Sequence, residues 1–175
     1  MKNLEIKIKI DSYDTIDNII NILKHFYVTD LLQSDTYFTV SEGRLKLREE
    51  SNKTPYMIYY QRPDLNSERY SDYSIYPITN VNMFNKVFSK LLHTELIIKK
   101  IRHLYVIKNA RIHIDEVEDL GNFLEIEIVI YNTDDENNAP AFMQELQDKL
   151  DINHYPKIDC GYRELLLKFN NKISQ

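Results

Sequence analysis

Basic side chains recur at every second position in three segments of the chain. The three pairs are Lys7 and Lys9, Lys46 and Arg48, and Lys100 and Arg102. Side chains two residues apart on a β-strand point to the same face, so each pair would present two cations side by side. Ammonium and guanidinium groups bind phosphate oxygens. The pattern therefore predicts a site for a polyanion such as a polyphosphate.

Acidic side chains follow the same spacing near both ends of this pattern. Glu125 and Glu127 lie two residues apart, and Glu5 precedes Lys7 by two positions. Clustered carboxylates suit Mg²⁺ or Mn²⁺, hard cations that bind oxygen and bridge phosphate groups. We therefore expect Glu125 and Glu127 to point the same way and to share one metal ion.

The alternation has a simpler explanation, because a sheet with one solvated face also alternates apolar and polar residues. For one strand alone this explanation is favoured. Five segments, however, combine a charged face with an aliphatic face, and amphipathic helices can cover the aliphatic faces from outside. The charged faces would then line the interior of a barrel. So much buried charge requires a ligand, which again favours a bound polyanion.

About eight strands and a few helices must position these residues. Alternating or β-rich segments cover residues 3–10, 35–40, 44–48, 56–62, 71–76, 98–104, 110–117 and 123–130. Apolar residues at helical spacing occur within 16–26, 82–92 and 135–150. Strands in runs with few intervening helices favour an α+β fold over parallel βαβ winding. We expect an eight-stranded antiparallel closed β-barrel with helices packed outside.

Bulk properties narrow the class of protein. Residues 1–175 are expected to form a single domain. The only cysteine, Cys160, excludes an intramolecular disulfide, and no signal-peptide pattern is found, so a cytoplasmic protein is expected. No apolar run approaches the roughly 18 residues of a spanning helix, which argues against a membrane role. The net charge of −5 argues against binding duplex nucleic acid, and a homodimer stays open on base rates.

The sequence resembles the CYTH superfamily, also called triphosphate tunnel metalloenzymes, and within it the class IV adenylyl cyclase-like branch. The longest matching stretches are Asn3-Leu-Glu-Ile-Lys-Ile-Lys, Gly43-Arg-Leu-Lys-Leu-Arg-Glu, Arg111-Ile-His-Ile-Asp-Glu-Val and Leu120-Gly-Asn-Phe-Leu-Glu-Ile-Glu. Shorter ones lie at 35–38, 59–64 and 100–102, with a weaker match at 161–162. The stretches occur in family order and together cover most of the chain. The resemblance implies an eight-stranded antiparallel tunnel that binds a triphosphate with one or two glutamate-held divalent metals.

The chain departs from the family pattern at two places. Aligned on the family's Glu-x-Glu-x-Lys motif, Asn3 replaces the first glutamate, while Glu5 and Lys7 match. An amide brings no negative charge, so the departure predicts weaker metal binding or the loss of one metal site, unless Glu125 and Glu127 hold the first metal. A family lysine on a later strand falls on Gln61, so its phosphate role is either moved to the adjacent Arg62 or missing.

The resemblance assigns roles to the charged residues. The expected phosphate ligands are Lys7, Lys9, Lys46, Arg48, Arg62, Lys100, Arg102 and Arg111. The expected metal ligands are Glu5, Glu125, Glu127 and Asp115, and the expected catalytic residues are Asp115, Lys100 and Arg111. Asp115 would orient water or a ribose hydroxyl if it is not a ligand; its simpler role is an ion pair with Arg111. His113 is interpreted as a packed strand histidine, and Tyr37, Tyr60 or Tyr162 could contact an adenine.

Three functions are compatible with such a site. In an adenylyl cyclase the ribose 3′-hydroxyl of ATP attacks the α-phosphorus and pyrophosphate leaves, and the branch resemblance places this reaction first. In a triphosphatase water attacks the terminal phosphorus of thiamine triphosphate, inorganic tripolyphosphate or a nucleoside triphosphate. The absence of a carboxylate at Asn3 motivates the third function, a non-catalytic module that binds polyphosphate or nucleotide.

Overall fold

The fold is given by a computed structural model that describes residues 2–61 and 69–173. The strands are β1 (Lys2–Lys9), β2 (Tyr27–Phe38), β3 (Arg44–Glu50), β4 (Tyr56–Gln61), β5 (Arg69–Pro77), β6 (Thr94–Ile107), β7 (Ala110–Val117) and β8 (Gly121–Ile130). The helices are α1 (Tyr13–Leu23), the short 3₁₀ helix η1 (Lys24–Phe26), α2 (Val81–Leu91), α3 (Thr133–Lys149) and α4 (Tyr162–Ile173). The α+β class and the expected eight strands are confirmed. The strand expected at 35–40 is only the end of β2, and α4 was not predicted.

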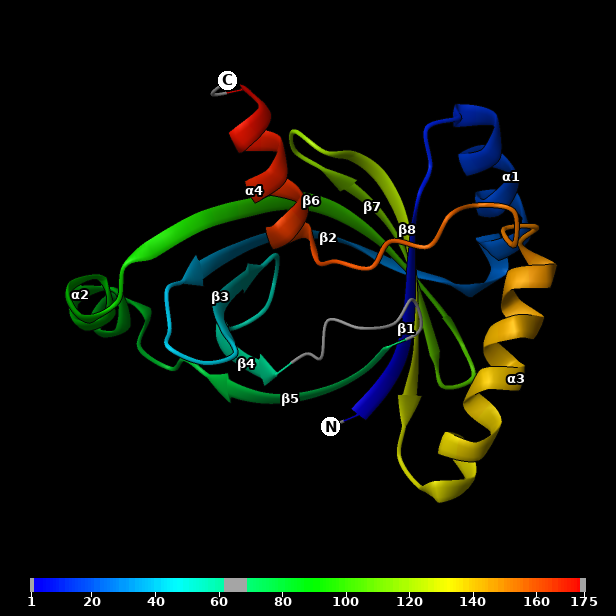
Figure 1. Ribbon diagram of the computed structural model, residues 1–175. Coiled ribbons are helices and arrows are strands. Elements are labelled where there is room, and N and C mark those ends of the chain that lie inside the picture. Colours follow the sequence, from blue (N-terminus) through cyan, green and yellow to red (C-terminus); the bar gives the residue numbers. More distant parts are fainter. Residues whose placement is uncertain (1, 62–68, 174–175) are drawn as a thin grey trace.

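All eight strands pair antiparallel, in the order β1-β5-β4-β3-β2-β6-β7-β8, and β8 returns to β1. The seam between β1 and β5 is short. Only Lys2 to Glu5 pair with β5, whereas β1 pairs with β8 over its whole length. Beyond Glu5 the edge of β1 instead bonds to the segment before α4, where Ile158 donates its N–H to the Lys7 carbonyl at 2.8 Å. The expected closed barrel is therefore wrong in this detail: the wall is a strongly curled sheet that β5 does not close along its full length (Figure 1).

Aliphatic outer faces and amphipathic helices form the main core. Leu4, Ile6 and Ile8 of β1 are buried with Ile112 of β7 and Met143 of α3. Each such side chain contributes about 1.5–3 kcal/mol through removal from water. In Figure 1, α1 and α3 lie together beside β1 and β8. Packing of helices on the outside is thus confirmed for these two, and the concave face is left to the charged residues.

Helix α4 packs differently from α1 and α3. Its residues Tyr162 and Leu166 are buried against Tyr37, Ile98 and Phe123, which belong to the same core cluster at one end of the curled sheet. The helix contacts β6 and lies apart from α1 and α3 (Figure 1). It therefore covers one end of the concave face. Among the described helices, none has the length and apolar composition that crossing a membrane requires.

A histidine on the outer face ties three strands together and gives a pH prediction. His103 of β6 lies with Nδ1 2.6 Å from Asp30 of β2 and Nε2 3.2 Å from Glu116 of β7. Although burial opposes its charge, these carboxylates raise the pKa of His103 above the usual value. A raised folded-state pKa adds stability that is complete below about pH 6.5 and is lost as pH rises through the folded value.

We expect the wild-type protein to lose roughly 0.5–1 kcal/mol of unfolding free energy between pH 6 and pH 8.5 from this group, after discounting for solvent screening. Denaturant unfolding at both pH values measures the loss, and His103→Gln should remove it. An unchanged pH dependence in His103→Gln would assign the effect to other groups.

Candidate functional site

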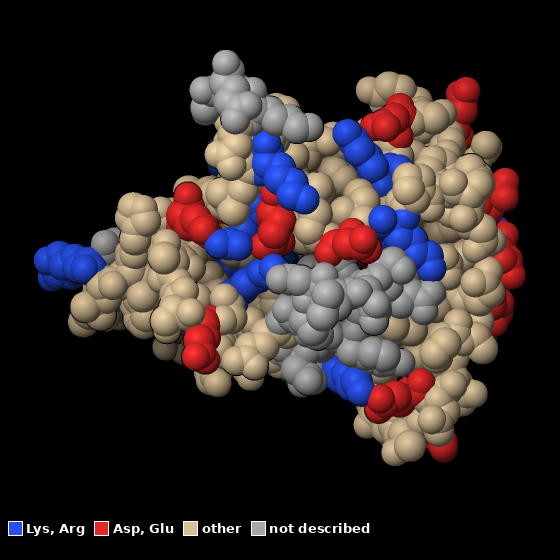
Figure 2. All heavy atoms as spheres, in the orientation of Figure 1, with Lys and Arg blue, Asp and Glu red and all other residues tan. Residues whose placement is uncertain are grey.

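The concave face of the sheet encloses a cavity of about 260 Å³. Nine of the residues expected from the sequence line it: Glu5, Lys7, Lys46, Arg48, Lys100, Arg102, Arg111, Glu125 and Glu127. Those on β1, β7 and β8 point inward because the alternate residues of these strands belong to the main aliphatic core, and Leu47, between Lys46 and Arg48 of β3, is buried in a separate core cluster. Figure 2 shows basic and acidic side chains intermingled near the middle of one face of the molecule.

One group of charges joins β2 to β3. Asp35 accepts hydrogen bonds from Arg48 Nε and Nη2, both at 2.6 Å, and from Lys46 Nζ at 2.8 Å. Burial opposes ionisation of Asp35, but Arg48 and Lys46 outweigh it and hold the pKa of this carboxyl far below its usual range. Burial and the neighbouring Arg48 lower the pKa of Lys46 to about 8. The carboxylate fixes both basic side chains in place on the cavity wall.

A second group on β6 and β7 repeats this arrangement. Asp115 accepts from Arg102 Nε at 2.7 Å, from Arg102 Nη2 at 2.6 Å and from Lys100 Nζ at 3.0 Å. Asp115 is fully buried and does not line the cavity. Burial opposes its charge, but Arg102 and Lys100 hold the pKa of Asp115 well below its usual range. These hydrogen bonds hold the Lys100 and Arg102 side chains in place.

Lys100 has an unusual acidity within this second group. Its side chain is 2% exposed, and burial together with the adjacent Arg102 lowers the pKa of Lys100 to about 7. The ion pair with Asp115 opposes this shift without reversing it. An amine that titrates near neutral pH can exchange a proton with a reacting group.

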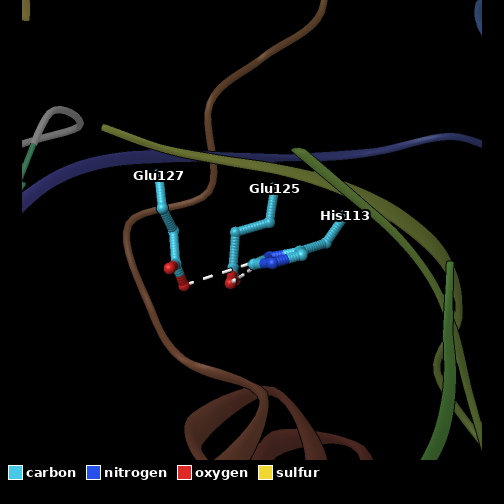
Figure 3. A group of neighbouring side chains, drawn as sticks. All are labelled: His113, Glu125 and Glu127. Atoms are coloured by element: carbon cyan, nitrogen blue, oxygen red, sulfur yellow. Dashed lines mark ion pairs between the residues drawn. The ribbon is translucent and has the colours of Figure 1, made fainter. Parts of the chain in front are cut away.

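The carboxylates of β8 meet a histidine of β7. Glu125 accepts from Lys7 Nζ at 2.9 Å and from Arg102 Nη2 at 3.1 Å, while Glu127 pairs with Arg111 Nη2 at 2.7 Å. His113, Glu125 and Glu127 each offer one ligand atom, and these atoms lie within 4.8 Å of one another (Figure 3). Burial and the adjacent Arg102 lower the pKa of His113, which favours the neutral imidazole. Glu5 is the register neighbour of Glu127 on β1.

Two buried polar atoms near this cluster test whether a divalent metal fits. Asn3 Oδ1 and His113 Nδ1 are buried and make no hydrogen bond within the described part of the chain. An unsatisfied buried acceptor costs about 1–3 kcal/mol, so its persistence calls for an explanation such as an ion. Carboxylate, amide and imidazole groups are all metal ligands. The residues present therefore fit a divalent cation.

Tyr162 brings α4 into the site. Its hydroxyl donates to Asp115 Oδ2 at 2.9 Å, and its ring centroid lies 4.1 Å from Lys7 Nζ and 4.8 Å from Lys100 Nζ. The Glu164 carboxylate accepts from the Gly161 N–H at 2.9 Å, which satisfies an N–H at the start of α4. From the sequence, Tyr162 was predicted only as a possible adenine contact. The residues around it in the sequence do not indicate its hydrogen bond to Asp115.

The remaining expected residues are placed elsewhere. Lys9 is exposed, lies 3.6 Å from Asp11 and does not line the cavity. Arg62 lies outside the described residues. Asp35 was not among the residues predicted from the sequence, and His113 was predicted only as a packed strand residue. Asp35 could have been found by extending its strand backward, because Gln33, Asp35 and Tyr37 alternate with outward-facing residues.

Comparison with known proteins gives consistent relatives. A Methanocaldococcus jannaschii protein named as a candidate adenylate cyclase is 27% identical, covering 94% of this chain and 98% of its own. A Pyrococcus furiosus protein of unassigned function is 27% identical with a TM-score of 0.76, covering 93% of this chain and 99% of its own. A Hippeastrum protein, titled a candidate adenylyl cyclase with a dominant triphosphatase activity, shares the fold at 15% identity and a TM-score of 0.64, covering 91% of each chain.

A sequence model of the CYTH domain matches residues 1–159, nearly the whole chain. The match spans β1 to β8, and thus every strand that carries a charged residue of the cavity. Because the CYTH domain model matches most of its length, the chain belongs to the CYTH domain family.

Proposed function

We propose that the protein is a divalent-metal-dependent enzyme that binds a nucleoside triphosphate in the concave cavity, and that it converts ATP to cyclic AMP and pyrophosphate. The observation that carries the proposal is the distribution of charge around the cavity. Lys46 and Arg48 lie on β3, four strands from the carboxylates of β8 in either direction around the sheet. A chain of phosphates could therefore contact cations along one wall and a metal at the other.

Two buried aspartates prepare the cations for such a ligand. Asp35 and Asp115 hold the two Lys-x-Arg pairs in fixed geometry before any phosphate arrives. Donors that are already oriented need not reorganise as charge develops on a leaving pyrophosphate, which is the main source of electrostatic catalysis. The proposed role of Asp115 is thus to orient Lys100 and Arg102. The proposed role of Arg111, whose side chain is partly exposed, is to contact phosphate directly.

The proton inventory of the reaction points to Lys100. Attack of the ribose 3′-oxygen on the α-phosphorus forms one P–O bond, breaks the bond to pyrophosphate and releases one proton. Lys100, with a pKa of about 7, is suited to take up that proton at neutral pH. A divalent ion held by Glu125 and Glu127 would polarise phosphate oxygens as a Lewis acid.

A triphosphatase is the second candidate, in which water attacks the terminal phosphorus, phosphate forms, and the remaining diphosphate is the leaving group, which is pyrophosphate when tripolyphosphate is the substrate. The Hippeastrum relative favours it, because that protein is described as having a dominant triphosphatase activity. The same cations and carboxylates would serve, with the triphosphate lying in the opposite direction along the cavity. A third reading, binding without turnover, is motivated by the uncharged amide of Asn3 at the buried end of β1.

Product analysis separates these functions. Purified protein is incubated with ATP and with tripolyphosphate, each in Mg²⁺ and in Mn²⁺. Cyclic AMP with equimolar pyrophosphate supports the cyclase, and free phosphate without cyclic nucleotide supports the triphosphatase. Tight binding without product in either metal supports the binding module, and activity gained by Asn3→Glu would identify the missing carboxylate as the reason.

Ligand-induced stabilisation tests the cavity itself. Tripolyphosphate at about 100 times its dissociation constant should raise the unfolding free energy by about 2.7 kcal/mol, which corresponds to roughly 5–10 °C in Tm. Sulfate at equal ionic strength is the control. If neither ATP nor tripolyphosphate shifts Tm beyond the sulfate value, all three functions are contradicted.

A further inference from the structure

We propose that His113 is a metal ligand and that it makes the site of Glu125 and Glu127 prefer a transition-metal cation that binds nitrogen, such as Co²⁺ or Zn²⁺, to Mg²⁺. The inference rests on the proposed function only in requiring that a divalent cation binds at this cluster. It concerns this chain's own histidine, at a position where an oxygen ligand would be the more usual partner for Mg²⁺.

The three side chains converge from two paired strands. In the β7–β8 register His113 lies directly opposite Glu125, and Arg111 lies opposite Glu127. His113 Nδ1 is 3.5 Å from one oxygen of Glu125 and 4.0 Å from one oxygen of Glu127. Ligands held about 2.1 Å from one cation lie roughly 3.0–3.5 Å apart, so only small side-chain movements are needed. Figure 3 shows the imidazole directed at both carboxylates.

The histidine nitrogen has the burial of a ligand, and its nearest protein partners are the two carboxylates of the cluster. His113 is 4% exposed, and its Nδ1 makes no hydrogen bond within the described residues. The Glu127 oxygen that faces it is not the one paired with Arg111. A buried nitrogen aimed at two carboxylates, with no hydrogen bond to hold it there, is placed as a metal ligand would be.

The donor atoms determine which cation is favoured. Mg²⁺ takes oxygen ligands and gives up its water reluctantly, whereas imidazole suits Co²⁺, Zn²⁺ and related ions. One imidazole with two carboxylates is a mixed nitrogen–oxygen set. Replacing an oxygen ligand by His113 Nδ1 therefore shifts selectivity toward the ions that bind nitrogen.

Neighbouring cationic side chains affect how tightly a metal ion binds at this site. Glu125 is shared with Lys7 and Arg102, which compete with a metal for its oxygens. A bound triphosphate would offer those two cations other acceptors. We therefore expect metal affinity to rise when tripolyphosphate is present. By thermodynamic linkage, metal should raise the affinity for tripolyphosphate by the same factor.

The test compares metal binding by wild-type protein, His113→Asp and Glu127→Gln without nucleotide. Isothermal titration of the chelator-treated full chain measures Co²⁺ and Mg²⁺ affinities, and the visible absorption of bound Co²⁺ gives an independent readout. We expect wild type to favour Co²⁺ over Mg²⁺ by about 100-fold, and His113→Asp to lower that ratio at least tenfold by restoring an oxygen ligand. Glu127→Gln should weaken both metals together.

A Co²⁺ to Mg²⁺ ratio unchanged within twofold in His113→Asp overturns the proposal. If that variant does not fold, Co²⁺ bound to wild-type protein labelled with ¹⁵N-histidine should show electron–nuclear coupling to nitrogen, and absence of coupling overturns the proposal instead. Turnover is measured separately. Cobalt binding through His113 with no triphosphate turnover would contradict only the enzymatic function, and turnover with an unchanged ratio would contradict only the role of His113.

Discussion

Arg102→Met is expected to lower the unfolding free energy by about 3–5 kcal/mol, because it leaves buried carboxylates without their main cation. Arg102 donates two hydrogen bonds to Asp115 and one to Glu125, and its side chain is 6% exposed. Methionine fills similar space but cannot compensate either charge. Denaturant unfolding at pH 7 measures the loss, and a decrease in Tm of roughly 6–20 °C should accompany it.

Arg111→Met provides the matched control for this prediction. Arg111 also pairs with a β8 carboxylate, Glu127, but its side chain is 39% exposed. Solvent can take over the role of the lost guanidinium, so the expected cost is below about 1 kcal/mol. Equal destabilisation by the two substitutions would mean that burial does not decide the strength of these pairs.

Glu125→Gln is expected to separate metal-dependent turnover from phosphate binding. The substitution keeps the shape of the side chain and removes one ligand charge. Loss of a direct metal ligand should lower turnover more than about 100-fold, since even outer-shell changes cost 10–100-fold in metal affinity or activity. Without metal, Lys7 and Arg102 lose a competing carboxylate. Tripolyphosphate should then bind about tenfold more tightly, equivalent to 1.4 kcal/mol.

Turnover is assayed at saturating metal concentration. Tripolyphosphate affinity is measured by titration in the presence of a chelator. Glu49→Gln is the control, since Glu49 is an exposed carboxylate of β3 that does not line the cavity. If Glu125→Gln weakens metal-free tripolyphosphate binding as well as turnover, Glu125 maintains the structure of the site and does not act as a metal ligand.

The positions of the charged residues were largely predictable from the sequence. Alternation on a strand decides which face a side chain occupies, and it placed Lys46, Arg48 and Glu127 on the cavity wall without knowledge of the strand neighbours. The aliphatic residues between them identified the opposite face as the one under the helices. The eight strands followed from the same local signal.

The pairing of those residues was not predictable, because it depends on register between strands distant in sequence. Asp115 meets Lys100 and Arg102 only because β7 pairs with β6 as it does, and Tyr162 reaches Asp115 from a helix 47 residues further along the chain. The sequence pattern around His113 is that of an ordinary strand histidine, and only the β7–β8 register places Glu125 opposite it. The short seam between β1 and β5 likewise has no local signature.

The bond from Ile158 to Lys7 has a consequence for how the protein is made. The second half of β1 is bonded on one side by β8 and on the other by the segment that precedes α4. Because Ile158 follows Lys7 by 151 residues in the sequence, the strand that carries Lys7 cannot complete its pairing until that segment has been synthesised. Contacts of such long sequence separation form slowly, so we expect the phosphate site to assemble late in folding.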